Sequence, residues 1–428
     1  MSRAVAVNQD GSVPALPVGT TLLHIGLPKT GTTTLQRGAA VNRDQLLRQG
    51  VCYPGVAFNH RDPAAALMQR PLGWRGRGAV THGRRVWDEL IREANSSPAH
   101  RVFISSEFIC ESDDHQARRF RAELGEQLHV AITVRGFAEL LPSNWQQAIK
   151  AGHTGGFEQW LDDVLRRRQA PTVRTFYRRN DQAAIVGRWT GLLGPDNVTV
   201  VIADKQHPDR LITTFEQLLG LRPGTLAGRP LGGYAANRGL SAAEAELVRR
   251  VNLTMHEQRY DWRRYTSLIR HGLIARMQEN RRPRPDEPDL RLPGWTARDA
   301  LRTARSYAEM IRASGCRVIG DPAALTAPLP TVDHVEQPTG LPLDAVVEGI
   351  AGVLSAAEGL GPFFDRSADG LERRKVSDPL LDRVFDAEET RRVLNAHRST
   401  RHLRMRALGV AAGARIIDRA VRRISGRA

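Results

Sequence analysis

The chain has little of what marks secreted, metal-binding or membrane-spanning proteins. Its 428 residues include only three cysteines, Cys52, Cys110 and Cys316. Because these are odd in number and widely spaced, they predict neither a disulfide framework nor a zinc site. No stretch reaches the roughly 20 apolar residues that a membrane-spanning helix needs, and the N-terminus lacks the basic-then-apolar pattern of a signal peptide. A cytoplasmic location is therefore expected.

Acidic residues are also in short supply. Aspartate and glutamate total 46 against 62 lysines and arginines, so the formal net charge is +16. Such a surface favours polyanions, which include an anionic co-substrate, an acidic glycan, a lipid headgroup and nucleic acid. Neither zinc-finger spacing nor an aromatic-interleaved RNA signature is present, so no specific nucleic-acid partner is expected. The Met-His-Glu sequence at 255–257 does not continue into a His-Glu-x-x-His motif, and no metal site is expected.

Apolar runs alternate with helical patterns over much of the chain. The runs predict strands near 20–26, 51–54, 101–105, 129–134 and 197–202, with helices between them. This alternation indicates an α/β fold with a central parallel sheet, flanked by helices, and ligands at the carboxyl ends of the strands. We predict a flexible lead-in at 1–19, a main domain at 20–325, a Pro-rich linker at 326–342 and a largely helical C-terminal extension at 343–428.

The end of this extension, residues 391–428, is rich in arginine and has apolar residues at helical spacing. An amphipathic helix of this kind binds an anionic membrane surface, which would place the protein at the inner face of the membrane. The same pattern also fits a solvated helix face, a partner-binding segment or a disordered basic tail. The sequence leaves these alternatives open.

The segment 26–34 reads Gly-Leu-Pro-Lys-Thr-Gly-Thr-Thr-Thr, and it carries the strongest functional signal. An apolar run at 22–25 precedes it, and a helical pattern at 35–47, stopped by Gly50, follows it. A loop between a strand and a helix presents backbone N–H groups and the positive end of the helix dipole to an anion. Because Lys29 precedes Gly31 and Thr32 stands where the Walker A lysine would follow it, the loop is not a Walker A motif.

A second anion-binding pattern begins at Arg135, which follows the predicted strand at 129–134, and continues to Ser143 eight residues later. A guanidinium offers a planar, charge-assisted fork to a phosphate, and a hydroxyl at a helix start adds a neutral donor. Pro142 suits the first turn of a helix, so we predict a helix that begins near Leu141. A start at Phe137 would place Pro142 inside the helix and weaken the assignment of Ser143.

Together, the Lys-Thr-Gly-Thr-Thr loop and the Arg135–Ser143 spacing resemble the sulfotransferases that use 3′-phosphoadenylyl sulfate (PAPS). The resemblance covers roughly residues 20–225, with weaker echoes to about 325. It implies a P-loop NTPase-like sulfotransferase fold, PAPS as co-substrate without a metal, and an acceptor hydroxyl or amine on a carbohydrate, glycolipid or secondary metabolite. It also implies that Lys29 acts at the leaving oxygen and that Arg135 and Ser143 hold the 3′-phosphate. The 5′-phosphate ligands implied are Thr30, Gly31, Thr32 and Thr33, with Thr34 at the helix start.

The general base is less sharply defined. Glu107 follows the predicted strand at 101–105, and several carbohydrate sulfotransferases use a glutamate as base, so it is the first candidate. The same position also suits a carboxylate that caps a loop or pairs with an arginine. His60, in the loop after the second strand, is the second candidate, whereas His24 lies within the first strand and reads as a packed core residue.

The chain departs from the family at several positions. Cytosolic members place an adenine-stacking tryptophan where Thr34 stands, so Trp145, Phe157 and Trp160 become candidates for that stacking. The second contact to the 3′-phosphate is unplaced, with Arg238 a weak candidate. Two other functions stay open: a kinase with a similar loop, which would need ATP and magnesium, and a non-catalytic, membrane-associated protein that binds PAPS or its product.

Overall fold

The computed structural model describes residues 13–204, 207–227, 238–335, 338 and 340–358. These residues fall into two compact units that share the chain in alternating segments. The first unit holds 13–148, 155–227 and 289–335, and the second holds 149–154, 238–288 and 338–358, within the described residues. The predicted extension beyond 358, including the arginine-rich 391–428, lies outside them, and the predicted boundaries at 325 and 342 stay predictions.

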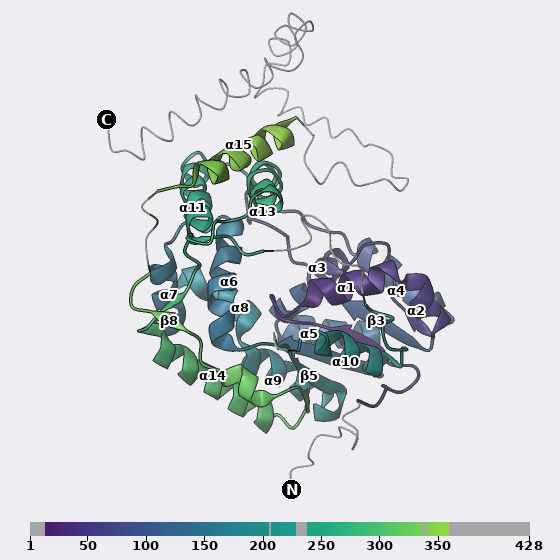
Figure 1. Ribbon diagram of the computed structural model, residues 1–428. Helices are drawn as coiled ribbons and strands as arrows, with labels where there is room; N and C mark the ends of the chain where they lie inside the picture. The colour runs from purple at the N-terminus through teal and green to yellow at the C-terminus, as the bar shows by residue number, and fades with distance from the viewer. Residues whose placement is uncertain (1–12, 205–206, 228–237, 336–337, 339, 359–428) are drawn as a thin grey trace, which may run out of the picture. The chain divides into compact units, whose positions relative to one another are not determined.

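A six-stranded sheet forms the centre of the first unit (Figure 1), and every pair of neighbouring strands in it is parallel. Its order is β2-β3-β1-β4-β5-β7. The strands are β1 (Thr21–His24), β2 (Val51–Cys52), β3 (Arg101–Ser105), β4 (Leu128–Val134), β5 (Val198–Ile202) and β7 (Arg317–Ile319). The predicted α/β class with a central parallel sheet is confirmed, and β7 is an additional strand at the sheet edge. Two-residue strands β6 (Leu292–Pro293) and β8 (Thr331–Val332) pair separately.

Helices flank this sheet in the first unit. The α-helices are α1 (Thr32–Val41), α2 (Arg43–Arg48), α3 (Arg61–Met68), α4 (Arg85–Ser96), α5 (Asp114–Leu124), α6 (Phe137–Lys150), α7 (Phe157–Arg166), α8 (Arg174–Asn180), α9 (Gln182–Leu193), α10 (Arg210–Leu219) and α14 (Thr296–Ala313). The 3₁₀ turns are η1 (Glu107–Glu111), η2 (Pro171–Val173), η3 (Pro195–Asn197) and η6 (Pro322–Thr326).

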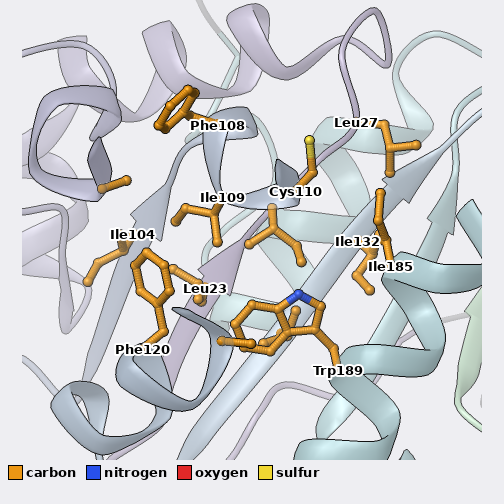
Figure 2. Close-up of a cluster of buried hydrophobic side chains, with 14 of the residues drawn as sticks. Leu23, Leu27, Ile104, Phe108, Ile109, Cys110, Phe120, Ile132, Ile185 and Trp189 are labelled. Carbon is orange, nitrogen blue, oxygen red and sulfur yellow. The ribbon is translucent and has the colours of Figure 1, made fainter. Parts of the chain in front are cut away.

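Both faces of the sheet are covered because side chains alternate along each strand. On one face, Leu23 of β1 and Ile104 of β3 pack with residues of α3, α5 and α9, including Phe120 and Trp189 (Figure 2). On the other face, Leu22 packs with residues of α1, α2 and α10. The near-continuous apolar strands therefore reflect burial on two sides.

Two predicted helices differ from the structure. The pattern at 35–47 forms two helices rather than one, because α1 ends at Val41 and α2 begins at Arg43. At the break, the Asn42 side-chain amide donates to the Gly38 carbonyl at 2.9 Å, the kind of local bond by which asparagine competes with helix continuation. The second difference, at α6, bears on the site and is described below.

The second unit is helical. It contains α11 (Ala242–Glu257), α12 (Trp262–Arg264), a π-helix η5 (Tyr265–Ile274), α13 (Ala275–Asn280) and α15 (Leu343–Ala357). Ser241 and Glu244 form a capping box at the start of α11, since they exchange side-chain to backbone hydrogen bonds. A Cβ at Gly352 would lie 2.3 Å from the Gly272 carbonyl oxygen, so α15 and the π-helix approach closely through glycine.

Candidate functional site

The sheet order brings the two predicted anion-binding segments to one edge. β1 lies between β3 and β4, and all three strands are parallel. Their carboxyl ends lead into the loop at 26–34, the segment at 105–107 and Arg135, respectively. Segments far apart in sequence thus meet where a parallel α/β sheet binds its ligands.

The loop at 26–34 is held against β4 and turns sharply. The N–H groups of Ile25 and Leu27 donate to the carbonyls of Ala131 and Thr133, each at 3.0 Å. A Cβ at Gly26 would lie 2.1 Å from Thr133 Oγ1, so this position has no room for a side chain. Lys29 has a φ of 71°, which places it in the left-handed region that non-glycine residues rarely adopt. The loop backbone is therefore both fixed and strained.

The backbone N–H groups of residues 29–33 make no hydrogen bond within the described part of the chain. They lie at the start of α1, whose N-cap is Gly31 with a φ of 88° and no side-chain cap. N–H groups and the helix dipole at such a start favour an anion. This is the arrangement expected for the predicted contacts of residues 30–34 with a phosphate.

The hydroxyl of Thr30 is engaged within the protein. Thr30 is buried, and its Oγ1 donates to the Leu27 carbonyl at 2.7 Å while lying 2.7 Å from Thr133 Oγ1. Its proton is therefore committed to the loop itself. Only the backbone N–H of Thr30 remains for a ligand. The side chain of Thr34 is exposed and that of Thr33 half-buried, while Thr32 is buried.

Two cations from the two segments meet at the loop. Arg135 Nη1 donates to the Lys29 carbonyl at 3.2 Å, which joins the end of β4 to the loop. Burial and the neighbouring Arg135 guanidinium lower the pKa of the Lys29 ammonium. An ammonium whose pKa is lowered by burial and a like charge is stabilised when an anion lies beside it. The pair is thus suited to a multiply charged anion.

Arg135 also has an acidic partner that the sequence analysis missed. Its Nε and Nη2 donate to Glu139 Oε2 at 2.8 and 2.5 Å, and both side chains are largely buried. Glu139 lies four residues later on α6, and this i, i+4 spacing is a signal that could have predicted the pair. A phosphate at Arg135 would either share the guanidinium with the Glu139 carboxylate or displace that carboxylate from it.

The predicted start of the helix near Leu141 is wrong. α6 begins at Phe137, and Pro142 lies inside it. Pro142 has no N–H to donate to the Ala138 carbonyl, so the helix tolerates a missing bond there. Ser143 therefore lies in the second turn, and its hydroxyl donates to the Leu140 carbonyl at 3.1 Å. Its predicted contact to a 3′-phosphate is weakened and stays a prediction.

Glu107 lies at the first residue of η1, directly beyond the end of β3. It is half-buried, and its Oε2 accepts a hydrogen bond from Gln36 Nε2 at 3.0 Å. The preceding Ser106 caps η1 by accepting from the Phe108 N–H at 3.3 Å. Glu107 has no arginine partner among the described ion pairs, so its carboxylate is held by the Gln36 amide.

His60 is held by backbone on both sides. Its Nδ1 accepts from the Ser105 N–H at 2.9 Å, so its Nε2–H donates to the Pro54 carbonyl at 2.8 Å. Burial lowers the pKa of His60 to about 4. With both ring nitrogens engaged, this geometry favours Glu107 over His60 as the group that accepts a proton.

The remaining candidate residues, for adenine stacking and for a second phosphate contact, are engaged in packing or in an ion pair. Trp145, Phe157 and Trp160 are each at most 4% exposed and pack edge-on or tilted against other aromatic rings, as core residues do. Arg238 pairs with the buried Glu244 in the second unit at 2.7 Å. Within the described residues, no group of three or more His, Cys, Asp or Glu side chains could hold a metal ion. No helix in the same residues is long and apolar enough to cross a membrane.

Comparison with known proteins gives limited guidance. The sequence matches no known protein family and no curated protein. Among solved structures, the chain is similar to the crystal structure of a sulfotransferase from Alicyclobacillus acidocaldarius, with 17% identity and a TM-score of 0.36 over 57% of this chain and 98% of that one. Values this low identify neither family nor activity. The functional argument therefore depends on the residues of the site.

Proposed function

We propose that this protein is a sulfotransferase that moves a sulfuryl group from PAPS to a hydroxyl or amine of a carbohydrate, glycolipid or secondary metabolite. The observation that carries the proposal is the meeting of Lys29 and Arg135 at a loop whose backbone N–H groups are available. In this proposal the Lys29 ammonium stabilises the charge on the 5′-phosphate of the leaving group. The Arg135 guanidinium supplies a second cation, which binds a second phosphate. A nucleotide with phosphates at both its 5′ and 3′ ends matches two cations from separate segments.

In the proposed reaction, the acceptor oxygen attacks sulfur in line with the bond to the 5′-phosphate. That bond breaks, its electron pair goes to the phosphate oxygen, and adenosine 3′,5′-bisphosphate leaves. The Lys29 ammonium stabilises the charge on the leaving oxygen, as preorganised cations do in group transfer. Glu107 accepts the acceptor's proton. Such a reaction depends chiefly on alignment and charge stabilisation.

Ligand-dependent stability tests the proposal. Adenosine 3′,5′-bisphosphate at a hundred times its Kd should raise the melting temperature by roughly 3 to 5 °C, because it binds the native state alone. ADP and ATP with magnesium should give smaller shifts. A shift with ATP–magnesium and none with the bisphosphate would instead indicate a phosphotransferase and refute the assignment.

The variants Arg135→Ala and Arg135→Lys sharpen this experiment. Both should lose most of the bisphosphate shift, because an ammonium does not reproduce the fork of a guanidinium. Arg188→Ala is the matched control, since Arg188 pairs with Asp114 on the surface of the same unit. If Arg135→Ala binds the bisphosphate as the wild type does, Arg135 has no part in the site.

A further inference from the structure

A continuous chain of polar side chains lies beneath the loop and reaches Glu107. It is almost fully buried, and its contacts join residues 69 to 109 positions apart in sequence. The contacts are Thr30 Oγ1 to Thr133 Oγ1 (2.7 Å), Thr133 Oγ1 to His24 Nε2 (3.3 Å), His24 Nδ1 to Ser105 Oγ (2.8 Å), Ser105 Oγ to Gln36 Nε2 (3.1 Å) and Gln36 Nε2 to Glu107 Oε2 (3.0 Å).

The direction of this chain follows from counting protons at its loop end. The Leu27 carbonyl can only accept, so Thr30 donates its single hydroxyl proton there. The contact between the two threonine oxygens then needs the proton of Thr133. Because Thr133 has no second proton, His24 must donate to it through Nε2–H. His24 is thus the Nε2–H tautomer.

The other half of the chain follows in the same way. Burial lowers the pKa of His24 to about 3, so its ring is neutral and Nδ1 is an acceptor. Ser105 therefore donates its proton to His24, and Ser105 in turn accepts from Gln36. The Gln36 amide has two N–H groups, one for Ser105 and one for Glu107. Each polar hydrogen of these side chains has a partner. Donation runs outward from the Gln36 amide, to Glu107 on one side and through Ser105, His24 and Thr133 to Thr30 on the other.

We propose that His24 and Gln36 are positioning residues that join the two halves of the active site through this directed chain. At one end Gln36 orients the Glu107 carboxylate. At the other end His24 acts through Thr133 on Thr30, whose hydroxyl fixes the turn that presents the backbone N–H groups of residues 29–33. The roles of the loop and of Glu107 rest on the proposed function. The hydrogen-bonded chain itself does not.

Thr133→Val and Thr133→Ser test the loop end, because valine has the shape of threonine without its hydroxyl. Thr133→Val should weaken binding of adenosine 3′,5′-bisphosphate about tenfold in calorimetry, since Thr30 and His24 each lose a partner. Thr133→Ser should restore wild-type affinity. Equal affinity for Thr133→Val and wild type would overturn the proposal.

A matched control separates positioning from general stability. Thr199 of β5 is also fully buried, and its hydroxyl lies 2.8 Å from His129 Nε2, whereas no side-chain hydrogen bond among the described residues joins it to the loop at 26–34. Thr199→Val should reduce stability as Thr133→Val does and leave the bisphosphate affinity unchanged. If both variants lose affinity equally, the effect is a general loss of stability and the positioning role is refuted.

Nitrogen-15 NMR of the histidine side chains tests the direction of the chain without a ligand. The expected signal for His24 is a neutral Nε2–H tautomer throughout pH 6 to 8. An Nδ1–H tautomer would overturn the proposal whether or not the protein binds a nucleotide. Wild-type protein that shows the expected tautomer but does not bind the bisphosphate would refute the proposed function and leave the chain intact.

Discussion

Mild acid should destabilise the first unit through three buried histidines. Burial lowers the pKa of His24 to about 3 and that of His60 to about 4, and burial with the charge of Arg317 lowers the pKa of His129 to about 4. In the unfolded chain a histidine takes up its proton near pH 6.5. Below this pH the three histidines are protonated in the unfolded state and remain neutral in the folded state. The free energy of unfolding therefore falls as the pH drops below 6.5.

The size of the effect follows from these values. Between pH 7 and pH 5, each histidine lowers the free energy of unfolding by about 2 kcal/mol, and the three together lower it by about 5 to 6 kcal/mol. A native domain is stable by about 5 to 15 kcal/mol, so the loss is a large part of the total. Ion-paired carboxylates add to the loss only at lower pH, because they take up protons nearer pH 4.

Urea unfolding followed by tryptophan fluorescence at several pH values measures this loss, since Trp87 and Trp189 are fully buried in the first unit. His129→Gln is the informative variant, because an amide can donate to the Thr199 hydroxyl and does not titrate. It should remove about a third of the pH dependence. A wild-type stability that is constant from pH 7 to pH 5, or an unchanged slope in His129→Gln, would refute the reasoning.

Two further predictions concern the site. Gly26→Ala places a Cβ 2.1 Å from Thr133 Oγ1 and 2.5 Å from His24 Nε2, so it should lower the free energy of unfolding by about 1–3 kcal/mol and weaken bisphosphate binding, measured by urea unfolding and calorimetry. Gly187→Ala in α9, where a Cβ meets nothing within 4 Å, is the control, and an unchanged Kd in Gly26→Ala would contradict the geometry. Glu107→Gln should keep bisphosphate affinity and lower sulfate transfer to pooled acceptors by about a hundredfold or more, and full transfer would exclude Glu107 as the base.

The parts of the fold that sequence predicted are those with local signals. Five strands of the sheet were predicted because each is a short apolar run, and β4 is buried along its whole length. β7 was missed because only Ile319 of its three residues is buried. The start of α6 was misplaced because Pro142 usually marks a first turn, whereas here the helix accepts it in the interior.

The candidate site also has residues that the sequence predicts and residues whose role it does not predict. Lys29, Arg135 and Glu107 follow strands, and the parallel order of those strands makes their approach predictable. The role of His24 was not predictable, because its partners Ser105 and Thr133 are 81 and 109 residues away. In sequence it looked like a core residue, and it is as buried as one. Only the three-dimensional contacts show that its ring nitrogens link two strands.

At Lys29 the backbone conformation favours one kind of residue and the proposed chemistry requires another. With a φ of 71°, the backbone there favours glycine, and a side chain costs about 1–2 kcal/mol. Lysine and arginine are the side chains that supply a cation at that point of the loop. The chain has lysine at this turn although glycine would make the fold more stable. Backbone strain of this kind is found at functional sites. Under the function proposed above, stability favours glycine at position 29 and activity favours lysine.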